Sequence, residues 1–271
     1  MTDKQFAYQI RLDALEMVHN SHASHIGSAF SVADIIAVLY NSVLKFNPKD
    51  PKWPQRDRFV LSKGHAGSAL YAALAEKGFF NKSELIKEYC QNGSHYSGHI
   101  SHKGVPGVEF STGSLGHGVC VATGLAMAGK MNQANYHVFA VTGDGECDEG
   151  SFWETLLFAN QNKLTNYTII IDRNKMQAMG FCKDVMNTEN LKDKISSFGL
   201  ETIVVDGHNF VQLKRELESY GKKTAKCIIA ETTKGKGVSF MENQLLWHYR
   251  DPQGEFYDKA KAELEEELKN A

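Results

Sequence analysis

VTGDGECDEG, residues 141–150, places a Gly-Asp-Gly turn directly after an apolar run and follows it with further acidic residues. The glycines on either side of Asp144 let the backbone approach a ligand closely and keep bulk away from the carboxylate. Taken alone the pattern is weak, because Asp and Gly are common turn formers in any strand-to-helix connection. A ligand site is therefore indicated only if a second polar segment meets this turn in space.

Segments of helical and of extended periodicity alternate on both sides of this turn. Strands are expected at 58–62, 137–142, 167–172, 201–205 and 226–231. Helices are expected at 7–19, 31–44, 65–77, 82–91, 116–130, 151–163, 189–197, 209–220 and 255–270, the second with Ser31 as its N-cap. Short, continuous β-rich runs separated by helices predict an α/β fold with a central parallel sheet covered by helices on both faces.

The composition, with 42% hydrophobic and 23% charged residues and a formal net charge of −2, is that of an ordinary globular protein. Because there is no basic excess, neither nucleic acid nor an anionic membrane is an expected partner. The N-terminal residues mix charges into an amphipathic pattern without an apolar signal-peptide core, so a cytoplasmic location is expected. Without repeats or a linker, residues 1–271 are expected to form a single domain with a C-terminal surface helix at about 255–270.

The five cysteines are odd in number, widely spaced and without a CxxC pair, which favours a reducing compartment. Cys147 lies inside the opening motif and could serve as a thiolate ligand or nucleophile. No spaced partner accompanies it, so a small buried thiol is the favoured interpretation.

A second polar segment follows the next expected strand, which ends in Asp172-Arg173-Asn174. The separation from Asp144 to Asn174 suits one helix crossover between neighbouring parallel strands, whose carboxyl ends meet at one edge of the sheet. One carboxylate, one amide oxygen and nearby backbone carbonyls make an all-oxygen, low-charge half-shell that Mg²⁺ accepts when a diphosphate completes its octahedron.

Four histidines, His25, His65, His99 and His248, lie in loop or helix-start contexts flanked by small residues, where a ring can face a cleft. Imidazole is the side chain whose unperturbed pKa suits proton transfer near neutrality. A lone histidine is more often structural, so their function depends on the surrounding motifs.

Three other patterns give weaker signals. His95, His99 and His102 are spaced like zinc ligands, but the small residues between them indicate an irregular loop, and no cysteine or carboxylate completes a site. Residues 124–130 copy the spacing of a nucleotide-binding P-loop, but Met131 replaces the hydroxyl that would hold Mg²⁺. No GxGxxG follows a strand, so a Rossmann dehydrogenase loses its main support.

The ordered motifs together resemble the N-terminal, diphosphate-binding half of transketolase, as found in split, two-subunit enzymes. The matching segments are SHIGSAFSVADI (24–35), DRFVLSKGHAGSALY (57–71), SGHISHKGVPGVEFSTGSLGHG (97–118), GDGECDEGSFWE (143–154), IDRNKMQ (171–177), VDGH (205–208) and TTKGKGVSFMENQLLWH (232–248). The resemblance covers nearly the whole chain and implies a thiamine diphosphate-binding fold, with thiamine diphosphate and Mg²⁺ as cofactors. Ca²⁺ or Mn²⁺ is expected to be able to replace Mg²⁺.

The resemblance also implies roles for individual residues. Asp144, the Asn174 side chain and the Met176 carbonyl would ligate the metal. The cofactor would contact His65, Gly113, Ser114, Leu115, Gly143, Asp144, Gly145, Glu146, Asn174 and His248. The catalytic histidines would be His25, His65, His99 and His248, lining the channel above the cofactor. Glu149 would lie at the interface between subunits, in the acidic network that reaches the partner's cofactor-activating glutamate.

The implied reaction is transfer of a two-carbon ketol unit from a ketose, or ketose phosphate, to an aldose. Full-length transketolases carry a second half that binds the aminopyrimidine ring and clasps sugar phosphates, and this chain does not encode it. We therefore expect activity only with a separate partner subunit carrying the pyrimidine-binding domain, as an α2β2 heterotetramer, with a large apolar face for that contact.

The substrate is left open by the sequence. Tyr249 and Arg250 follow His248 where split transketolases usually have a small residue, and they could narrow the entrance, add an anion contact or be exposed tail residues. A pentose-phosphate transketolase is the first expectation. A specialised ketol transferase for another sugar, a subunit of another thiamine diphosphate enzyme, a non-catalytic homologue and a nucleotide-binding protein remain alternatives.

Overall fold

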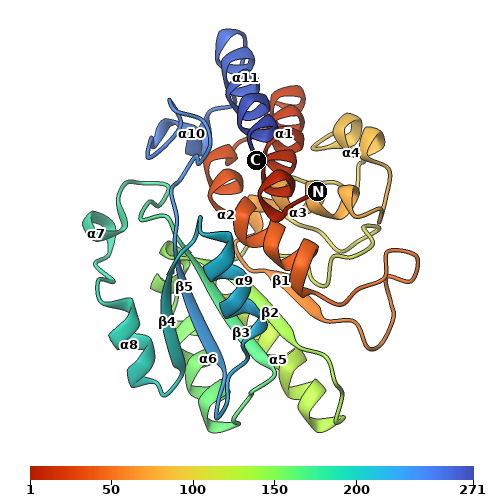
Figure 1. The fold of residues 1–271 in the computed structure, drawn as a ribbon. Helices are drawn as coiled ribbons and strands as arrows, with labels where there is room; N and C mark the ends of the chain where they lie inside the picture. Colours follow the sequence, from red (N-terminus) through yellow and green to blue (C-terminus); the bar gives the residue numbers. More distant parts are fainter.

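The computed structural model describes residues 1–271 throughout. At its centre lies a five-stranded sheet in which all neighbouring strands are parallel, in the order β1-β2-β3-β5-β4 (Figure 1). The strands are β1 (Arg58–Leu61), β2 (Val138–Gly143), β3 (Tyr167–Arg173), β4 (Glu201–Asp206) and β5 (Lys226–Glu231). All five expected strands are therefore confirmed.

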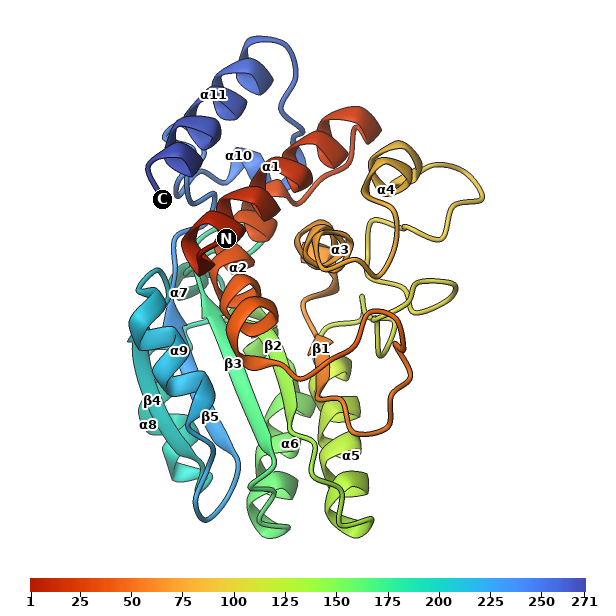
Figure 2. The ribbon, with the colours of Figure 1, turned by 45° about the vertical axis from the view of Figure 1, so that its right-hand side comes forward.

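Helices cover both faces of this sheet, as the alternating pattern predicted. Their bounds are α1 (Asp3–Ser21), α2 (Ile26–Val38), α3 (Gly67–Glu76), α4 (Lys82–Glu88), α5 (His117–Met131), α6 (Gly150–Gln161), α7 (Cys182–Val185), α8 (Leu191–Ser197), α9 (Phe210–Glu218), α10 (Leu246–Tyr249) and α11 (Glu255–Lys269). Figures 1 and 2 show α5, α6 and α8 on one face of the sheet and α9 with α2 on the other.

Alternate strand residues face two separate hydrophobic cores. On β2, Phe139 and Val141 belong to the core formed with α1, α2, α3 and α9. Val138 and Ala140 belong to the core formed with α5, α6 and α8. Because both faces are buried, the strand sequence is a continuous apolar run rather than an alternating one.

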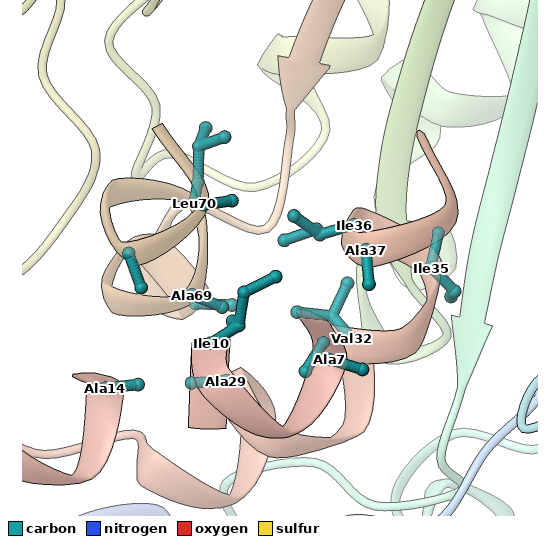
Figure 3. Packing of buried hydrophobic residues seen from close by; sticks show 14 of the residues in the cluster. Ala7, Ile10, Ala14, Ala29, Val32, Ile35, Ile36, Ala37, Ala69 and Leu70 are labelled. Carbon is teal, nitrogen blue, oxygen red and sulfur yellow. The ribbon is translucent and has the colours of Figure 1, made fainter. Parts of the chain in front are cut away.

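Helices α1, α2 and α3 pack against one another through small and branched side chains (Figure 3). Ala7 and Ile10 of α1, Ala29 and Val32 of α2 and Ala69 of α3 are at most 1% exposed. Small residues at such contacts allow helix axes to approach closely. The packing fixes the starts of α2 and α3, which the site described below uses.

The segment Ile26–Val43, which covers α2 and the π-helical turn Leu39–Val43, is long and apolar enough to cross a membrane by length and composition. However, 83% of this 18-residue window is buried inside the protein. A buried core helix has the same properties, so the segment is only weak evidence for a membrane span.

The start of α2 was predicted wrongly. The helix begins at Ile26, with His25 at the N-cap position in the left-handed region at φ 73°, and Ser31 lies five residues inside it. Ser31 is fully buried, and its hydroxyl donates a hydrogen bond of 2.6 Å to Asp172 Oδ2. The hydroxyl therefore serves a tertiary contact with β3, which a capping pattern cannot reveal.

Smaller differences concern turns. The helix expected from residue 65 is divided into a 3₁₀ turn, Gly64–Ala66, and α3. The short helices α7 and α10 were not expected. Helix α11 is present near the expected bounds and packs against α1, where Tyr8 Oη donates to Glu267 Oε2 at 3.1 Å.

His137, directly before β2, is expected to make stability depend on pH. The ring is 4% exposed, stacks on Tyr220 with 3.8 Å between ring centroids and lies 2.8 Å from Thr168 Oγ1 through Nε2. Burial, with a contribution from the Lys45 charge, lowers the pKa of His137 to about 3. In the unfolded chain the ring binds a proton below about pH 6.5, which the folded state does not.

The stability contributed by neutral His137 is therefore fully present above about pH 6.5 and is lost as the pH falls toward the folded pKa of about 3. Between about pH 7 and pH 5 the wild type should lose about 2 kcal/mol more unfolding free energy than His137→Gln. Urea denaturation of both proteins across this range measures the difference. Parallel pH profiles would show that His137 titrates normally in the folded chain.

Candidate active site

The carboxyl ends of four neighbouring strands bring polar residues to one edge of the sheet. Lys63 lies two residues beyond β1, Asp144 directly follows β2, Asn174 directly follows β3 and Thr232 directly follows β5. A cavity of about 350 Å³ opens beside this edge. It is lined by His25, Ser28, Lys63, His65, His99, Gly113, Leu115, Gly143, Asp144, Gly145, Glu146, Asn174, Met176, Gln177, Ala178, Met179, Lys234 and His248.

Every predicted site residue except Ser114 and Glu149 lines this cavity. Ser114 is exposed on the glycine-rich loop before α5, next to Leu115, which does line it. Glu149 is exposed at the N-cap of α6. On these two segments it is the nearby residues Leu115 and Glu146, respectively, that line the cavity.

Three predicted metal ligands are buried together on the loops after β2 and β3. Asp144, Asn174 and Met176 are 4%, 4% and 5% exposed. Asp144 accepts backbone hydrogen bonds from Gly145 N at 2.8 Å and from Lys175 N at 2.5 Å. Asn174 Oδ1 accepts from Met176 N at 3.1 Å, which closes the second loop on itself. These loops offer a carboxylate, an amide oxygen and a backbone carbonyl.

Asp144 is an electrostatically unsatisfied carboxylate. Its burial, followed by the negative charge of Asp172, raises its pKa to about 6, although two backbone donors and Lys63 act in the opposite direction. No Lys, Arg or His forms an ion pair with it. A cation bound beside Asp144 would supply the compensation that the folded chain lacks.

Two buried lysines border the same cavity, and each is 1% exposed. Lys63 forms an ion pair with Asp172 at the end of β3. Lys234 Nζ lies 2.8 Å from His248 Nδ1 and donates to the Met176 carbonyl at 3.3 Å. Burial, together with the nearby Lys63 charge, lowers the pKa of Lys234 to about 8. Two ammonium groups in the lining of a cavity favour an anionic ligand.

The four predicted histidines form one cluster although they come from four separate segments. The His25 ring centroid lies 5.2 Å from that of His65, 5.5 Å from that of His99 and 5.0 Å from that of His248. The backbone joins the cluster too, because His25 N donates to the His248 carbonyl at 2.9 Å. The fold therefore brings the four rings together at one place.

The inner histidines are held neutral. Burial lowers the pKa of His25 to about 4, with help from His99 and the lysines, and lowers that of His248 to about 3, with help from Lys234. Burial also lowers the pKa of His65 well below its usual value. A neutral imidazole donates a hydrogen bond from one ring nitrogen and accepts one through the other, so these rings can orient hydroxyl and carbonyl groups of a ligand.

Both carboxylate oxygens of Glu146 accept hydrogen bonds from the protein, so this side chain stabilises the surrounding segments and is not a free carboxylate. Its Oε1 accepts from Ser62 Oγ and from Gly116 N, the latter at 2.7 Å, and its Oε2 accepts from Thr142 Oγ1 at 2.7 Å. The side chain is 2% exposed. Glu146 therefore joins the ends of β1 and β2 to the glycine-rich loop that begins α5.

Gly143, the last residue of β2, lines the cavity and has open space where a side chain would stand. A Cβ added there would meet no atom within 4 Å. A ligand can therefore approach this backbone closely. Together with the oxygen donors on the loops after β2 and β3 and the two buried ammonium groups, this opening fits a metal ion that carries a diphosphate.

The alternative binding motifs do not assemble sites. No group of three or more His, Cys, Asp or Glu residues is arranged to hold a metal ion, and His102 Nδ1 instead lies 2.7 Å from Ser111 Oγ. Residues 124–130 lie inside α5, whereas a P-loop precedes its helix. Cys147 is fully buried, and burial raises the pKa of its thiol well above the usual value, as expected for a structural cysteine.

Tyr249 and Arg250 behave differently from each other. Tyr249 Oη donates to the Ala178 carbonyl at 3.0 Å, and its ring lies 4.9 Å from that of His248. It therefore ties the loop after β3 to α10 at the rim of the cavity. The Arg250 guanidinium lies over the Phe256 ring of α11, 5.6 Å from its centroid. It does not line the cavity, so the structure gives no support to the predicted contact between Arg250 and an anionic substrate.

Sequence reasoning missed Lys63, Lys234 and the roles of Asp172 and Ser31. A signal existed for Lys63, because a charged residue just after a buried strand was the pattern that selected Asp144. Lys234 also stands shortly after a buried strand, between Thr and Gly residues. In the sequence Asp172 marks only the end of a strand, because its buried partners Ser31, Lys63 and Thr232 come from distant segments.

Comparison with known proteins identifies the family. Residues 2–250 match the model of the transketolase, thiamine diphosphate binding domain. One subunit of the apulose-4-phosphate transketolase of Phocaeicola vulgatus is 40% identical over 256 residues, which cover 94% of this chain and 90% of the relative. The 6-deoxy-6-sulfo-D-fructose transketolase subunit SqwG of Clostridium sp. is 38% identical over 95% of this chain and 94% of the relative.

Solved structures agree with the sequence match. The crystal structure of Campylobacter jejuni transketolase superimposes with a TM-score of 0.90 at 32% identity, covering 97% of this chain and 42% of that chain. Human transketolase is 35% identical over 90% of this chain and 39% of its own length. The chain thus spans less than half of these longer transketolases but nearly all of the subunits named above, and it belongs to the transketolase N-terminal, thiamine diphosphate-binding domain family.

Proposed function

We propose that the chain is the diphosphate-binding subunit of a two-subunit transketolase, which transfers a two-carbon ketol unit from a ketose to an aldose. The observation that carries the proposal is the meeting of Asp144, Asn174 and Met176 with a cluster of four histidines in one cavity. Two relatives that match almost end to end are themselves named as transketolase subunits.

The proposed metal is Mg²⁺, which Ca²⁺ or Mn²⁺ could replace, with Asp144, the Asn174 amide and the Met176 carbonyl as its protein ligands. The diphosphate would lie against the loops at Gly113 to Leu115 and Gly143 to Glu146. When bound, thiamine diphosphate supplies the carbon nucleophile and electron sink for breaking and forming the C–C bond beside a ketose carbonyl.

The chain's own residues would handle protons and orientation. Neutral His25, His65 and His248 can accept a proton from a sugar hydroxyl and return it to a carbonyl oxygen. The Lys234 ammonium donates a hydrogen bond to His248 Nδ1, so the neutral ring carries its proton on Nε2. His99 is exposed on its loop and can take part as the substrate enters. The proposed role of Glu149 is at the partner interface, for which its exposure is suitable.

The proposed partner carries the pyrimidine-binding domain, and an α2β2 heterotetramer is the expected assembly. Large apolar side chains are exposed on several elements, including Met131 of α5 at 71%, Leu157 of α6 at 57% and Met179 at the cavity rim at 74%. Contact with a partner would remove such side chains from water.

The proposed donor is a ketose with an anionic terminal group. The relatives named above include one for a sugar phosphate and one for a sulfonated sugar, so a specialised sugar is as well supported as a pentose phosphate. We also propose a cytoplasmic location, which the free cysteines support.

The test is purification of tagged chain from lysate of its own cells with Mg²⁺ and thiamine diphosphate. The recovered protein is identified by mass spectrometry, and ketol transfer from sugar phosphates and sugar sulfonates is assayed in the complex and in the chain alone. A pyrimidine-domain partner with activity only in the complex supports the proposal. Activity of the chain alone contradicts the two-subunit model, and stabilisation by ATP instead of thiamine diphosphate would favour a nucleotide-binding protein.

A further inference from the structure

A buried chain of hydrogen bonds joins the segment after β1, helix α2, the end of β3 and the loop after β3, next to the proposed metal site. Its members are Lys63, Asp172, Ser31 and Asn174, all at most 4% exposed. Lys63 Nζ and Ser31 Oγ both contact Asp172 Oδ2, and Asn174 Nδ2 contacts Ser31 Oγ at 3.2 Å. We propose that Ser31 is a positioning residue that fixes the orientation of the Asn174 amide for metal binding. This inference rests on the proposed function.

The Asp172 carboxylate determines which groups in this chain donate and which accept a hydrogen bond. Its side chain is fully buried and forms an ion pair with the Lys63 ammonium, which has protons to donate and no lone pair to accept with. Thr232 Oγ1 donates to the other oxygen, Oδ1. A carboxylate paired with a buried ammonium group accepts hydrogen bonds on both oxygens, so Lys63, Ser31 and Thr232 all act as donors to Asp172.

The Ser31 hydroxyl therefore donates its one hydrogen bond to Asp172. The hydroxyl donates to Asp172 at 2.6 Å, and the Ser28 carbonyl, at 3.1 Å, is the weaker competing acceptor. With its proton committed, the Ser31 oxygen is left as an acceptor, which only the NH₂ of Asn174 can satisfy.

This polarity determines which end of the Asn174 amide faces the loop that carries Met176. With Nδ2 turned to Ser31, Oδ1 accepts the Met176 N–H at 3.1 Å and keeps a second lone pair for a cation. A flipped amide would place an NH₂ against the Met176 N–H and an oxygen against the Ser31 oxygen. Both contacts would be repulsive, and Asn174 would no longer present an oxygen to the metal.

The experiment measures Mn²⁺ binding by electron paramagnetic resonance with the full chain, saturating thiamine diphosphate and the partner subunit. Ser31→Ala should raise the Mn²⁺ dissociation constant about 10- to 100-fold, the usual effect of removing a group that orients a metal ligand. Ser31→Thr keeps the hydroxyl and should restore binding to within about threefold of wild type. Ser31→Cys, similar in size but with a weak hydrogen-bonding group, should behave like Ser31→Ala and serves if that variant does not fold.

The matched control is Thr123→Ala, which removes a buried hydroxyl that donates only to the Val119 carbonyl within α5. It should lower the melting temperature without changing Mn²⁺ affinity. A Ser31→Ala protein that melts at a lower temperature but binds Mn²⁺ like wild type would overturn the positioning role. Absence of cofactor-dependent Mn²⁺ binding by wild type would instead overturn the proposed function itself.

Discussion

Asp144→Asn is expected to abolish the protection that Mg²⁺ and thiamine diphosphate give against thermal unfolding of the chain with its partner. The substitution removes the only charged ligand of the proposed metal site but keeps an oxygen that can accept one of the two backbone hydrogen bonds. Loss of a direct ligand should weaken metal binding at least about 100-fold, which is more than the effect of losing a group that only orients a ligand. A ligand at 100 times its dissociation constant stabilises by about 2.7 kcal/mol, so the shift should nearly vanish.

Asp148→Asn is the matched control for this experiment. Asp148 belongs to the same 3₁₀ turn, Gly145–Asp148, but is exposed and accepts from Gln177 Nε2 at 2.7 Å. It removes the same charge but leaves the carboxylate of Asp144 in place. Full protection in Asp148→Asn and none in Asp144→Asn would locate the metal. Unchanged protection in Asp144→Asn would mean that the metal binds elsewhere.

Lys63→Met is expected to lower the free energy of unfolding by about 3–5 kcal/mol, even without cofactor. The methionine fills most of the space of the lysine stem, but Asp172 then remains as a buried carboxylate without its ion pair. Removing one partner of a buried pair is costly because the other charge loses its compensation. Chemical denaturation of the chain measures the loss.

The double variant Lys63→Met with Asp172→Asn separates this cause from a packing defect. An amide at 172 carries no charge, so the double variant should recover most of the stability lost in the single variant. With the loss measured for Asp172→Asn alone, the loss in the double variant minus the two single losses gives the coupling energy between the two side chains. If the two losses simply added, the Lys63–Asp172 contact would have no energetic role, and repacking around the introduced methionine would explain the result.

Much of this protein follows from local sequence. The alternation of short apolar runs with helical segments determined the parallel α/β sheet, because strands buried on both faces need apolar residues at every position. The position of Asp144 and Asn174 directly after two such strands determined that they would meet, since parallel strands end at the same edge. The motifs around the histidines identified the family before any contact between the rings could be known.

What the sequence left undecided depends on contacts between distant segments. Ser31 has the local pattern of a helix cap, yet its hydroxyl is used by Asp172, 141 residues away. Glu146 lies close to Asp144 in the motif, but its carboxylate accepts hydrogen bonds from three separate segments, through Ser62, Gly116 and Thr142. Whether a polar side chain faces a ligand or a buried partner is set by tertiary packing, because the cost of an unsatisfied buried group is decided by whatever the fold places next to it.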